Sequence, residues 1–236
     1  MPALPARGLV AFGFLISGVA AAGPSRGDCP GGFVFLGAHV DTTWSTAAIF
    51  EKTLGIEDGC GRGRGGYDAT TGTLSVDWWA GFVTEVAGCG MTDVYVVTGL
   101  PAGMPVAFAA TLEVHAHVSN NCSSSACGNV VRARLIRDGS DAGEWLRDLS
   151  GTGERSLDET LSLPITVDAG VPFSLATSLS SHFGGATGCG SWSRLAGTLR
   201  FPGLPPGVHV TSCHGYAGVP VPAELVSWGS LKATYR

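Results

Sequence analysis

Acidic and histidine side chains alternate with apolar ones along one stretch of the chain. Glu113, His115 and His117 occupy every second position. Apolar residues hold the other parity: Val106, Phe108, Ala110, Leu112, Val114, Ala116 and Val118. Successive side chains of a β-strand point to opposite faces of its sheet, so the three polar side chains should share one face. The stretch predicts a long antiparallel strand on a core, whose outer face carries either a metal site or a solvent-facing polar strip.

The two histidines resemble part of the metal motif of cupins. The glutamate that follows the histidines in that motif is absent here, because residues 119–122 read Ser-Asn-Asn-Cys. No two cysteines have the Cys-x2-Cys spacing of a zinc site. We therefore expect no cofactor, and a metal ion held by Glu113, His115 and His117 is the alternative.

Side chains suited to catalysis are present but form no recognisable motif. The sequence contains no Gly-x-Ser-x-Gly turn of the kind that presents a nucleophilic serine. Asp158 and Glu159 are adjacent, so on a strand they would face opposite ways and could not act as a catalytic pair. Asp138, Asp141 and Glu144 are candidates by residue type alone. We assign no catalytic residue and favour a protein that is not an enzyme; a secreted carbohydrate-active enzyme or hydrolase with a site on its loops is the alternative.

Residues 61–66 match the letters of a dinucleotide-binding motif, Gly-x-Gly-x-x-Gly. That motif needs a strand before it and a helix after it, because the helix N-terminus holds the phosphates. Tyr-Asp-Ala-Thr-Thr-Gly follows instead. We interpret the segment as a glycine-rich loop without a nucleotide site.

Six tryptophans offer a different binding chemistry, since aromatic rings can stack on sugar rings. They are Trp44, Trp78, Trp79, Trp145, Trp192 and Trp228. Aromatic side chains of a β-sandwich belong more often to its core than to its surface. The sequence leaves both roles open, and it makes glycans and components of the cell surface or matrix the candidate partners.

The beginning of the chain predicts export. Arg7 precedes a short apolar run at residues 9–19, and three alanines at 20–22 place small residues where a signal peptidase cleaves. The run is shorter than the roughly 20 residues that a membrane span needs. We predict a signal peptide at residues 1–22, no membrane span after its cleavage, and secretion to the extracellular space or cell surface, with the periplasm as an alternative.

The mature chain is acidic and sparsely charged. Without Arg7, 13 of the 14 basic residues stand against 19 acidic ones, which gives 13 − 19 = −6. The scattered arginines form no basic surface for nucleic acid. Low charge (14%), 36 glycines and 13 prolines are typical of short strands joined by tight turns. We predict one domain at residues 23–216 and a flexible tail at residues 217–236. The domain should be all-β: an antiparallel, jelly-roll-like sandwich of about nine or ten strands with little helix.

Turn residues indicate how the strands follow one another. Residues 91–118 predict a central hairpin whose turn, Gly-Leu-Pro-Ala-Gly at 99–103, recurs as Gly-Leu-Pro-Pro-Gly at 203–207. We expect these turns at one end of the sandwich. Pro164 lacks an N–H, so the strand at 157–167 should lie at an edge or contain a bulge. Glu159 falls on the apolar parity of that strand and needs a partner, and residues 46–54 have some helical character.

All seven cysteines follow the predicted cleavage site, in a compartment where thiols tend to pair. Spacing does not fix their connectivity. The pairs that we favour are Cys122–Cys127, Cys60–Cys89 and Cys189–Cys213. This choice leaves Cys29 unpaired.

Two motifs in the C-terminal part of the chain carry a resemblance. Residues 203–216 read Gly-Leu-Pro-Pro-Gly-Val-His-Val-Thr-Ser-Cys-His-Gly-Tyr, and residues 227–236 read Ser-Trp-Gly-Ser-Leu-Lys-Ala-Thr-Tyr-Arg. With the phrase at 97–106, they are similar to exported bacterial β-sandwich proteins of unknown function. Val-Pro-Val-Pro at 219–222 is similar to the start of a PEP-CTERM sorting tail. The resemblance carries over no catalytic residue. We expect an exported, disulfide-stabilised, non-enzymatic β-sandwich that serves as a structural or binding module.

Overall fold

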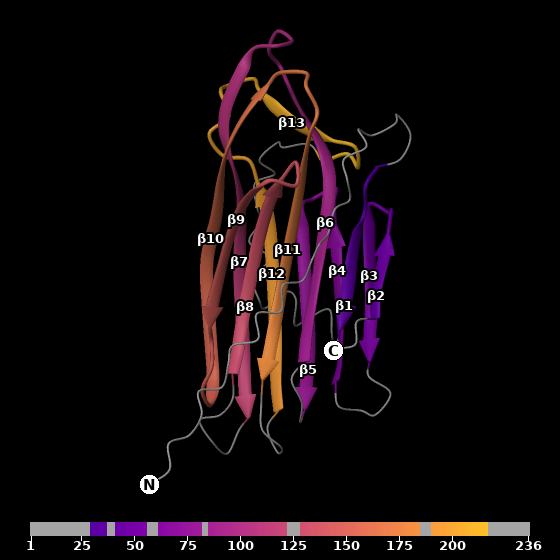
Figure 1. The fold of residues 1–236 in the computed structure, drawn as a ribbon, viewed down its shortest axis with the longest axis vertical. Coiled ribbons are helices and arrows are strands. Elements are labelled where there is room, and N and C mark those ends of the chain that lie inside the picture. The colour runs from indigo at the N-terminus through magenta and orange to yellow at the C-terminus, as the bar shows by residue number, and fades with distance from the viewer. Residues whose placement is uncertain are drawn as a thin grey trace.

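The computed structural model describes residues 29–36, 41–55, 61–81, 85–121, 128–184 and 190–216. Over these ranges the chain forms 13 strands and no helix, which confirms the all-β class with more strands than expected. Two antiparallel sheets pack face to face as a sandwich of long strands (Figure 1). The strands are β1 (Gly32–Leu36), β2 (Asp41–Ser45), β3 (Ile49–Gly55), β4 (Gly61–Asp68), β5 (Thr73–Gly81), β6 (Glu85–Thr98), β7 (Pro105–Asn121), β8 (Gly128–Arg137), β9 (Asp141–Asp148), β10 (Gly153–Asp168), β11 (Phe173–Gly184), β12 (Gly190–Arg200) and β13 (His209–Ser212).

The apolar layer between the sheets follows from the period-two pattern of the sequence. The seven-stranded sheet has the order β2-β1-β6-β11-β8-β9, with β13 also pairing with β6, and the six-stranded sheet has the order β10-β7-β12-β5-β4-β3. In β7, the apolar positions from Val106 to Val118 are buried, as predicted. β8, β11 and β12 show the same alternation. These strands therefore contribute apolar faces to a shared core, and burial of that core holds the sheets together.

The chain passes from one sheet to the other through the turn after β6. Because β6 and β7 lie in different sheets, the predicted hairpin over residues 91–118 is wrong. The turn itself is as expected: Gly99 and Gly103 have φ values of +93° and +81°, which glycine adopts readily. The related turn at 203–207 lies beside it, since a Cβ on Gly99 would approach the carbonyl oxygen of Gly207 to 2.1 Å. Both turns occupy one end of the sandwich, which confirms that expectation.

Two segments form strands where the sequence predicted other structure. Most of residues 46–54 belong to β3, which pairs with β4, so the expected helical character is absent. Residues 61–66 begin β4 and are no loop. Gly63 and Gly65 leave room for the core, because a Cβ there would lie 2.5 Å from Trp78 Cβ and 2.8 Å from Val34 Cγ1. Glycine is needed where neighbouring side chains press against the strand, and this composition concealed the strand.

The edge strand β10 explains both unusual residues of its sequence. Pro164 is exposed on this edge strand, as its missing N–H predicted. Glu159 accepts hydrogen bonds from Arg147 of β9, with Nε to Oε1 at 2.7 Å and Nη2 to Oε2 at 2.6 Å. β9 is the edge strand of the other sheet, so this pair joins the two sheets along one open side.

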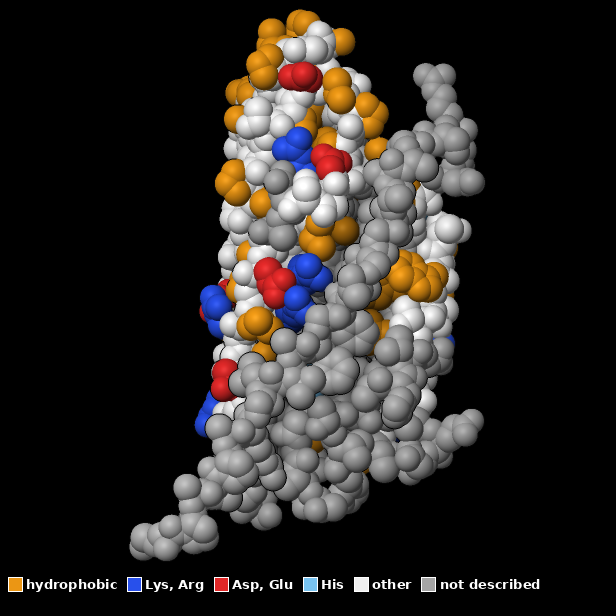
Figure 2. All heavy atoms as spheres, in the orientation of Figure 1, with side chains coloured by type: hydrophobic (Ala, Val, Ile, Leu, Met, Phe, Trp, Pro, Cys, Tyr) orange, Lys and Arg blue, Asp and Glu red, His pale blue; other side chains and the backbone are white. Residues whose placement is uncertain are grey.

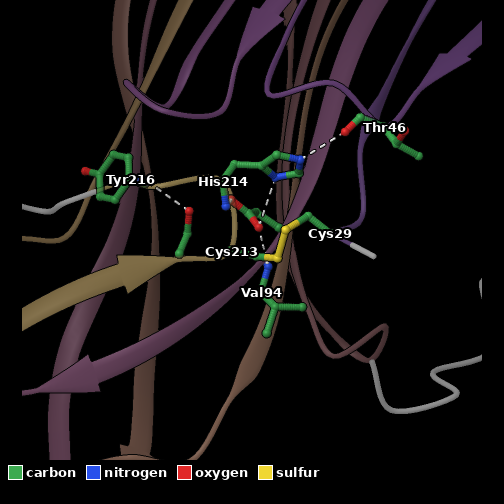
Figure 3. Close-up of a disulfide and its surroundings, with 8 residues drawn as sticks. Cys29, Thr46, Val94, Cys213, His214 and Tyr216 are labelled. Atoms are coloured by element: carbon green, nitrogen blue, oxygen red, sulfur yellow. Dashed lines mark hydrogen bonds and ion pairs between the residues drawn. A yellow bond between two sulfur atoms is a disulfide. The ribbon is translucent and has the colours of Figure 1, made fainter. Parts of the chain in front are cut away.

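A disulfide between Cys29 and Cys213 joins the two ends of the described chain (Figure 3). β1 pairs with residues 87–91 of β6, and β13 pairs with residues 95–98. Thr92 N donates to the Gly31 carbonyl and Cys213 N to the Val94 carbonyl, so both strands follow the same edge of β6. Cys29 and Cys213 meet where these strands abut, with their Cα atoms 5.6 Å apart. Beside the bridge, His214 Nδ1 lies 3.2 Å from the buried Asp93 carboxylate.

This bridge corrects two of the predicted pairings. Cys213 pairs with Cys29 and not with Cys189, because β6 brings together segments 184 residues apart in the sequence. Cys89 is a free, buried thiol, which contradicts the pairing with Cys60. Its burial raises its pKa to about 12. The predicted Cys122–Cys127 bridge lies outside the described residues.

Three other predictions also fall on residues that the structure does not describe: the signal peptide at 1–22, the tail at 217–236, and Trp228. Within the described ranges, no helix is long and apolar enough to cross a membrane.

Candidate functional site

The outer face of the six-stranded sheet carries a row of polar side chains across the whole sheet. The strand register aligns one residue from each strand: Ser156, His117, Arg194, Asp77, Arg64 and Thr53. Each of these residues has the outward parity of its strand, since the neighbouring positions are mostly buried. The row therefore forms a continuous line of hydrogen-bonding groups at the surface.

A second row lies two residues along the strands and contains two tryptophans. Trp192 of β12 is paired with Trp79 of β5, and Trp79 is paired with Arg62 of β4. The two rows border an open groove of about 550 Å³. Its lining residues are Thr53, Arg62, Gly63, Arg64, Asp77, Trp78, Trp79 and Trp192. Aromatic and charged side chains thus share one surface depression.

Glycines allow Trp79 to lie low against the sheet. A Cβ on Gly81 would lie 2.6 Å from Trp79 Cη2, and a Cβ on Gly190 would lie 3.5 Å from Trp79 Nε1. A side chain at Gly81 would displace the indole, whereas a Cβ at Gly190 would only touch it. The ring is partly exposed and borders the groove, so it offers a flat apolar surface to a ligand.

Trp192 is held in place by a carboxylate and a guanidinium. Its Nε1 donates to Asp77 Oδ1 at 2.8 Å, and the Arg194 guanidinium lies 4.2 Å from its ring centroid. Arg194 also donates to Asp77 Oδ2 at 3.4 Å, and Arg64 Nη2 lies 3.9 Å from the same oxygen. Asp77 therefore orders three neighbouring side chains, which gives the groove a defined arrangement of donors and acceptors.

A buried hydrogen-bond network lies behind this part of β12. Ser191 and Ser193, which flank Trp192, point inward and accept hydrogen bonds from Asn129 Nδ2 of β8, each at 3.0 Å. Ser181 of β11 donates to Asn129 Oδ1 at 2.9 Å, and Ser191 donates to Asn120 Oδ1 of β7 at 2.7 Å. The network links both sheets and fixes the strand that carries Trp192 and Arg194. Buried polar groups that satisfy one another in this way favour one arrangement of the core.

The predicted metal ligands lie on the outer face of β7, as the alternation required. Each has its own partner on a neighbouring strand: Glu113 accepts from Arg200 Nε at 2.8 Å, His115 Nδ1 lies 2.5 Å from Asp158, and His117 Nδ1 lies 3.0 Å from Ser156 Oγ. Among the described residues, no group of three or more His, Cys, Asp or Glu side chains is arranged to hold a metal ion. In this arrangement each of the three side chains is engaged by a residue of an adjacent strand.

The acidic residues considered for catalysis do not converge. Asp158 and Glu159 face opposite ways, the first toward His115 and the second toward Arg147. Asp138 lies in a turn, where its Oδ1 accepts from Ser174 N at 2.8 Å. Glu144 pairs with Arg132 and Arg134 on the seven-stranded sheet. Asp141 has no described side chain.

The outer face of the seven-stranded sheet carries its own charged and aromatic side chains. Figure 2 shows acidic and basic side chains interspersed with apolar ones over this side of the molecule. Arg132 and Arg134 share Glu144, at 2.9 and 3.1 Å. Trp44 of β2 is 63% exposed and packs on Phe33, with ring centroids 5.0 Å apart. This exposed tryptophan lies outside the groove.

The tryptophans divide between the two roles that the sequence left open. Trp78 and Trp145 are buried in the core, although Trp78 also borders the groove, whereas Trp79 and Trp192 are partly exposed and line it. The charged residues beside them, Asp77, Arg62, Arg64 and Arg194, were not among the predicted site residues. A signal for Asp77 exists: Ser75, Asp77 and Trp79 alternate with buried Leu74, Val76 and Trp78, which predicts one outward polar-aromatic face. Nothing local predicts that β12 and β4 would add arginines beside it.

No protein-family model matches this chain, and no curated protein matches it. Solved structures that are similar to part of it include TmCBM61 and a CBM4 structure. The structure of TmCBM61 in complex with beta-1,4-galactotriose is 10% identical in sequence and has a TM-score of 0.28. The match covers 63% of this chain and 86% of the TmCBM61 chain. A CBM4 structure is 15% identical in sequence and also has a TM-score of 0.28. The match covers 65% of this chain and 93% of the CBM4 chain.

Proposed function

We propose that this protein is an exported, non-enzymatic binding module that holds a glycan chain in the groove of its six-stranded sheet. The observation that carries the proposal is the pairing of Trp79 and Trp192 beside the polar row that contains Asp77, Arg64 and Arg194. A sugar ring has apolar C–H faces and a rim of hydroxyl groups. Trp79 can cover such a face, while charged groups beside it bind the hydroxyls.

The shape of the groove suits an extended ligand better than a small enclosed one. It is an open depression, and the polar row continues beyond it along the sheet to His117 and Ser156. A chain of sugars can lie across several strands in contact with successive residues of this row. Export agrees with the predicted signal peptide and with the Cys29–Cys213 bridge, because disulfides persist in oxidising compartments.

The charges of the groove favour binding over hydrolysis. Glycoside hydrolysis commonly uses two carboxyl groups on either side of the scissile bond. Among the described lining residues, Asp77 is the single carboxylate, and it is engaged by Trp192 and Arg194. We therefore propose a module that recognises a polysaccharide or glycan of the cell surface or matrix and leaves it intact.

The test compares two tryptophan variants of the oxidised mature protein on a panel of soluble polysaccharides. Trp79→Ala should weaken binding at least about tenfold, because a few buried aromatic side chains commonly supply most of the binding free energy of a site. Trp44→Ala, which removes an exposed tryptophan from the other sheet, should bind like the wild type. Affinity electrophoresis and calorimetry measure the binding, and thermal unfolding confirms that both variants fold. Binding to no glycan, or equal binding by Trp79→Ala and wild type, would refute the proposal.

A further inference from the structure

Arg62 stands out from the other cations at the groove because it has no partner among the described residues. Its side chain is exposed and lines the groove. No hydrogen bond or ion pair joins it to any residue within the described ranges. By contrast, Arg194 and Arg64 both approach Asp77, and Arg64 Nη1 lies 3.8 Å from Glu51 Oε1. The positive charge available to a ligand is therefore concentrated at Arg62.

The register places this charge beside the aromatic surface. Arg62 and Trp79 are directly paired on neighbouring strands and share the outward face of the sheet. The Cβ atoms of such a pair lie about 5 Å apart, and both side chains line the groove, so one ligand ring in the groove can contact both. A ring lying on Trp79 thus presents its substituents to Arg62.

The lining carries a net positive charge in an acidic protein. Arg62 and Arg64 stand against Asp77 among the lining residues, whereas the whole chain has a net charge of −5. A guanidinium forms paired hydrogen bonds with the two oxygens of a carboxylate or sulfate. A hydroxyl of a neutral sugar can accept a hydrogen bond from the guanidinium, but it offers no opposite charge.

We infer that the groove selects anionic glycans, whose rings carry carboxylate or sulfate groups, and that Arg62 is the residue that selects them. The inference rests on the proposed glycan-binding function and names its ligand class. A sugar ring stacks on Trp79, and its acidic substituent pairs with Arg62. Asp77 and its two arginines bind neighbouring hydroxyls.

Two matched pairs of ligands test the inference while keeping the sugar backbone constant. The first pair is polygalacturonate and its fully methyl-esterified form, and the second is a sulfated galactan and its desulfated form. Calorimetry at low and high salt should show that the anionic member of at least one pair binds about tenfold more tightly at low salt. The preference should shrink as salt rises, because screening weakens the ion pair. The pair that shows it identifies the anionic group as carboxylate or sulfate.

Arg62→Gln should remove this preference, because it should weaken binding of the anionic member by about tenfold more than it weakens binding of the uncharged member. Arg155→Gln, an exposed arginine at the far edge of the same sheet, is the control and should keep the preference. Equal binding of charged and uncharged members by the wild type, or a preference that survives Arg62→Gln, would overturn the inference and leave glycan binding standing. Failure of every glycan to bind would instead overturn the proposed function, and the inference with it.

Discussion

Trp192 donates its indole N–H to Asp77 Oδ1 at 2.8 Å, across adjacent strands of the six-stranded sheet. The same carboxylate accepts a hydrogen bond from Arg194, whose guanidinium lies over the Trp192 ring. One acidic residue therefore orients an aromatic side chain and a cation together. The groove owes its order to this contact, and its loss should be visible both in binding and in the environment of the indole.

Replacement of Asp77 by alanine should release Trp192 and leave two arginines without their shared carboxylate. We expect glycan affinity to fall about five- to tenfold, while the free energy of unfolding changes by at most about 1 kcal/mol, because the pairs are partly exposed. Tryptophan fluorescence and calorimetry measure the two effects. Ser75→Ala, the next outward position on β5, is the control. Unchanged affinity in Asp77→Ala would contradict the ordering role.

Replacement of Asn129 by alanine should destabilise the sandwich by about 2–4 kcal/mol, because the hydroxyls of Ser181, Ser191 and Ser193 lose a buried partner. Urea unfolding gives the value. Asn121→Ala, at an exposed position on β7, should cost less than about 0.5 kcal/mol. Equal stability of the two variants would show that the network contributes nothing specific.

The double variant Cys29→Ser/Cys213→Ser should lose roughly 5 kcal/mol of stability, the chain-entropy estimate for a loop of this length. The bridge spans 184 residues, so its removal greatly enlarges the freedom of the unfolded chain. Denaturant unfolding of oxidised wild type, reduced wild type and the variant measures the loss. Reduction should not destabilise the variant to the extent that it destabilises the wild type. A variant as stable as the oxidised protein would refute the role of this bridge.

Cys89 should resist alkylation in the native protein. Burial raises its pKa to about 12, so at pH 8 almost none of it is the reactive thiolate, and the core blocks access as well. Mass spectrometry of the peptide that contains Cys89, after treatment with iodoacetamide, measures the modification. The same treatment in guanidinium chloride should label it fully. Rapid native labelling would contradict its position in the core.

The Arg147–Glu159 pair should make the stability of the sandwich depend on pH. Hydrogen bonding from Arg147 lowers the pKa of Glu159 below its ordinary value of 4.5, so the folded state binds this proton less readily than the unfolded state. The stabilisation is therefore present above pH 4.5 and is lost as the pH falls through the lowered pKa. Glu159→Gln should be slightly less stable than wild type at pH 7, and the gap should close in acid. A gap that is constant with pH would exclude the ionic contribution.

The strands are predictable where one face is buried and the local chemistry is unambiguous. The alternation along β7 is enough to assign its inward and outward faces, and Pro164 indicates an edge. Glu159 occupies an inward, otherwise apolar position of its strand, which predicted that it has a partner. That partner is Arg147, because a carboxylate on an inward face needs a hydrogen-bonding group of opposite charge. These features depend on residues close together in the sequence.

The features that the sequence did not predict all depend on contacts between segments far apart in the chain. Gly63 and Gly65 are typical of a loop, and only the packing of Trp78 and Val34 against them explains why a side chain is excluded there. The turn after β6 was recognised, but nothing local states whether a chain turns back within its sheet or crosses to the other. The groove likewise depends on the register of β4, β5 and β12, which a sequence without its pairing partners does not specify.

The division of the β6 edge between β1 and β13 has a consequence for truncated or incomplete chains. A chain cut before residue 209 leaves the backbone of residues 95–98 without its β13 partner. Such a bare edge accepts a strand from any chain that can supply one. A synthetic peptide of residues 208–216 should bind to the exposed edge of such a truncated chain and restore the missing strand. Intact molecules that exchange β13 with one another would instead form intertwined dimers, held together by intermolecular Cys29–Cys213 bonds.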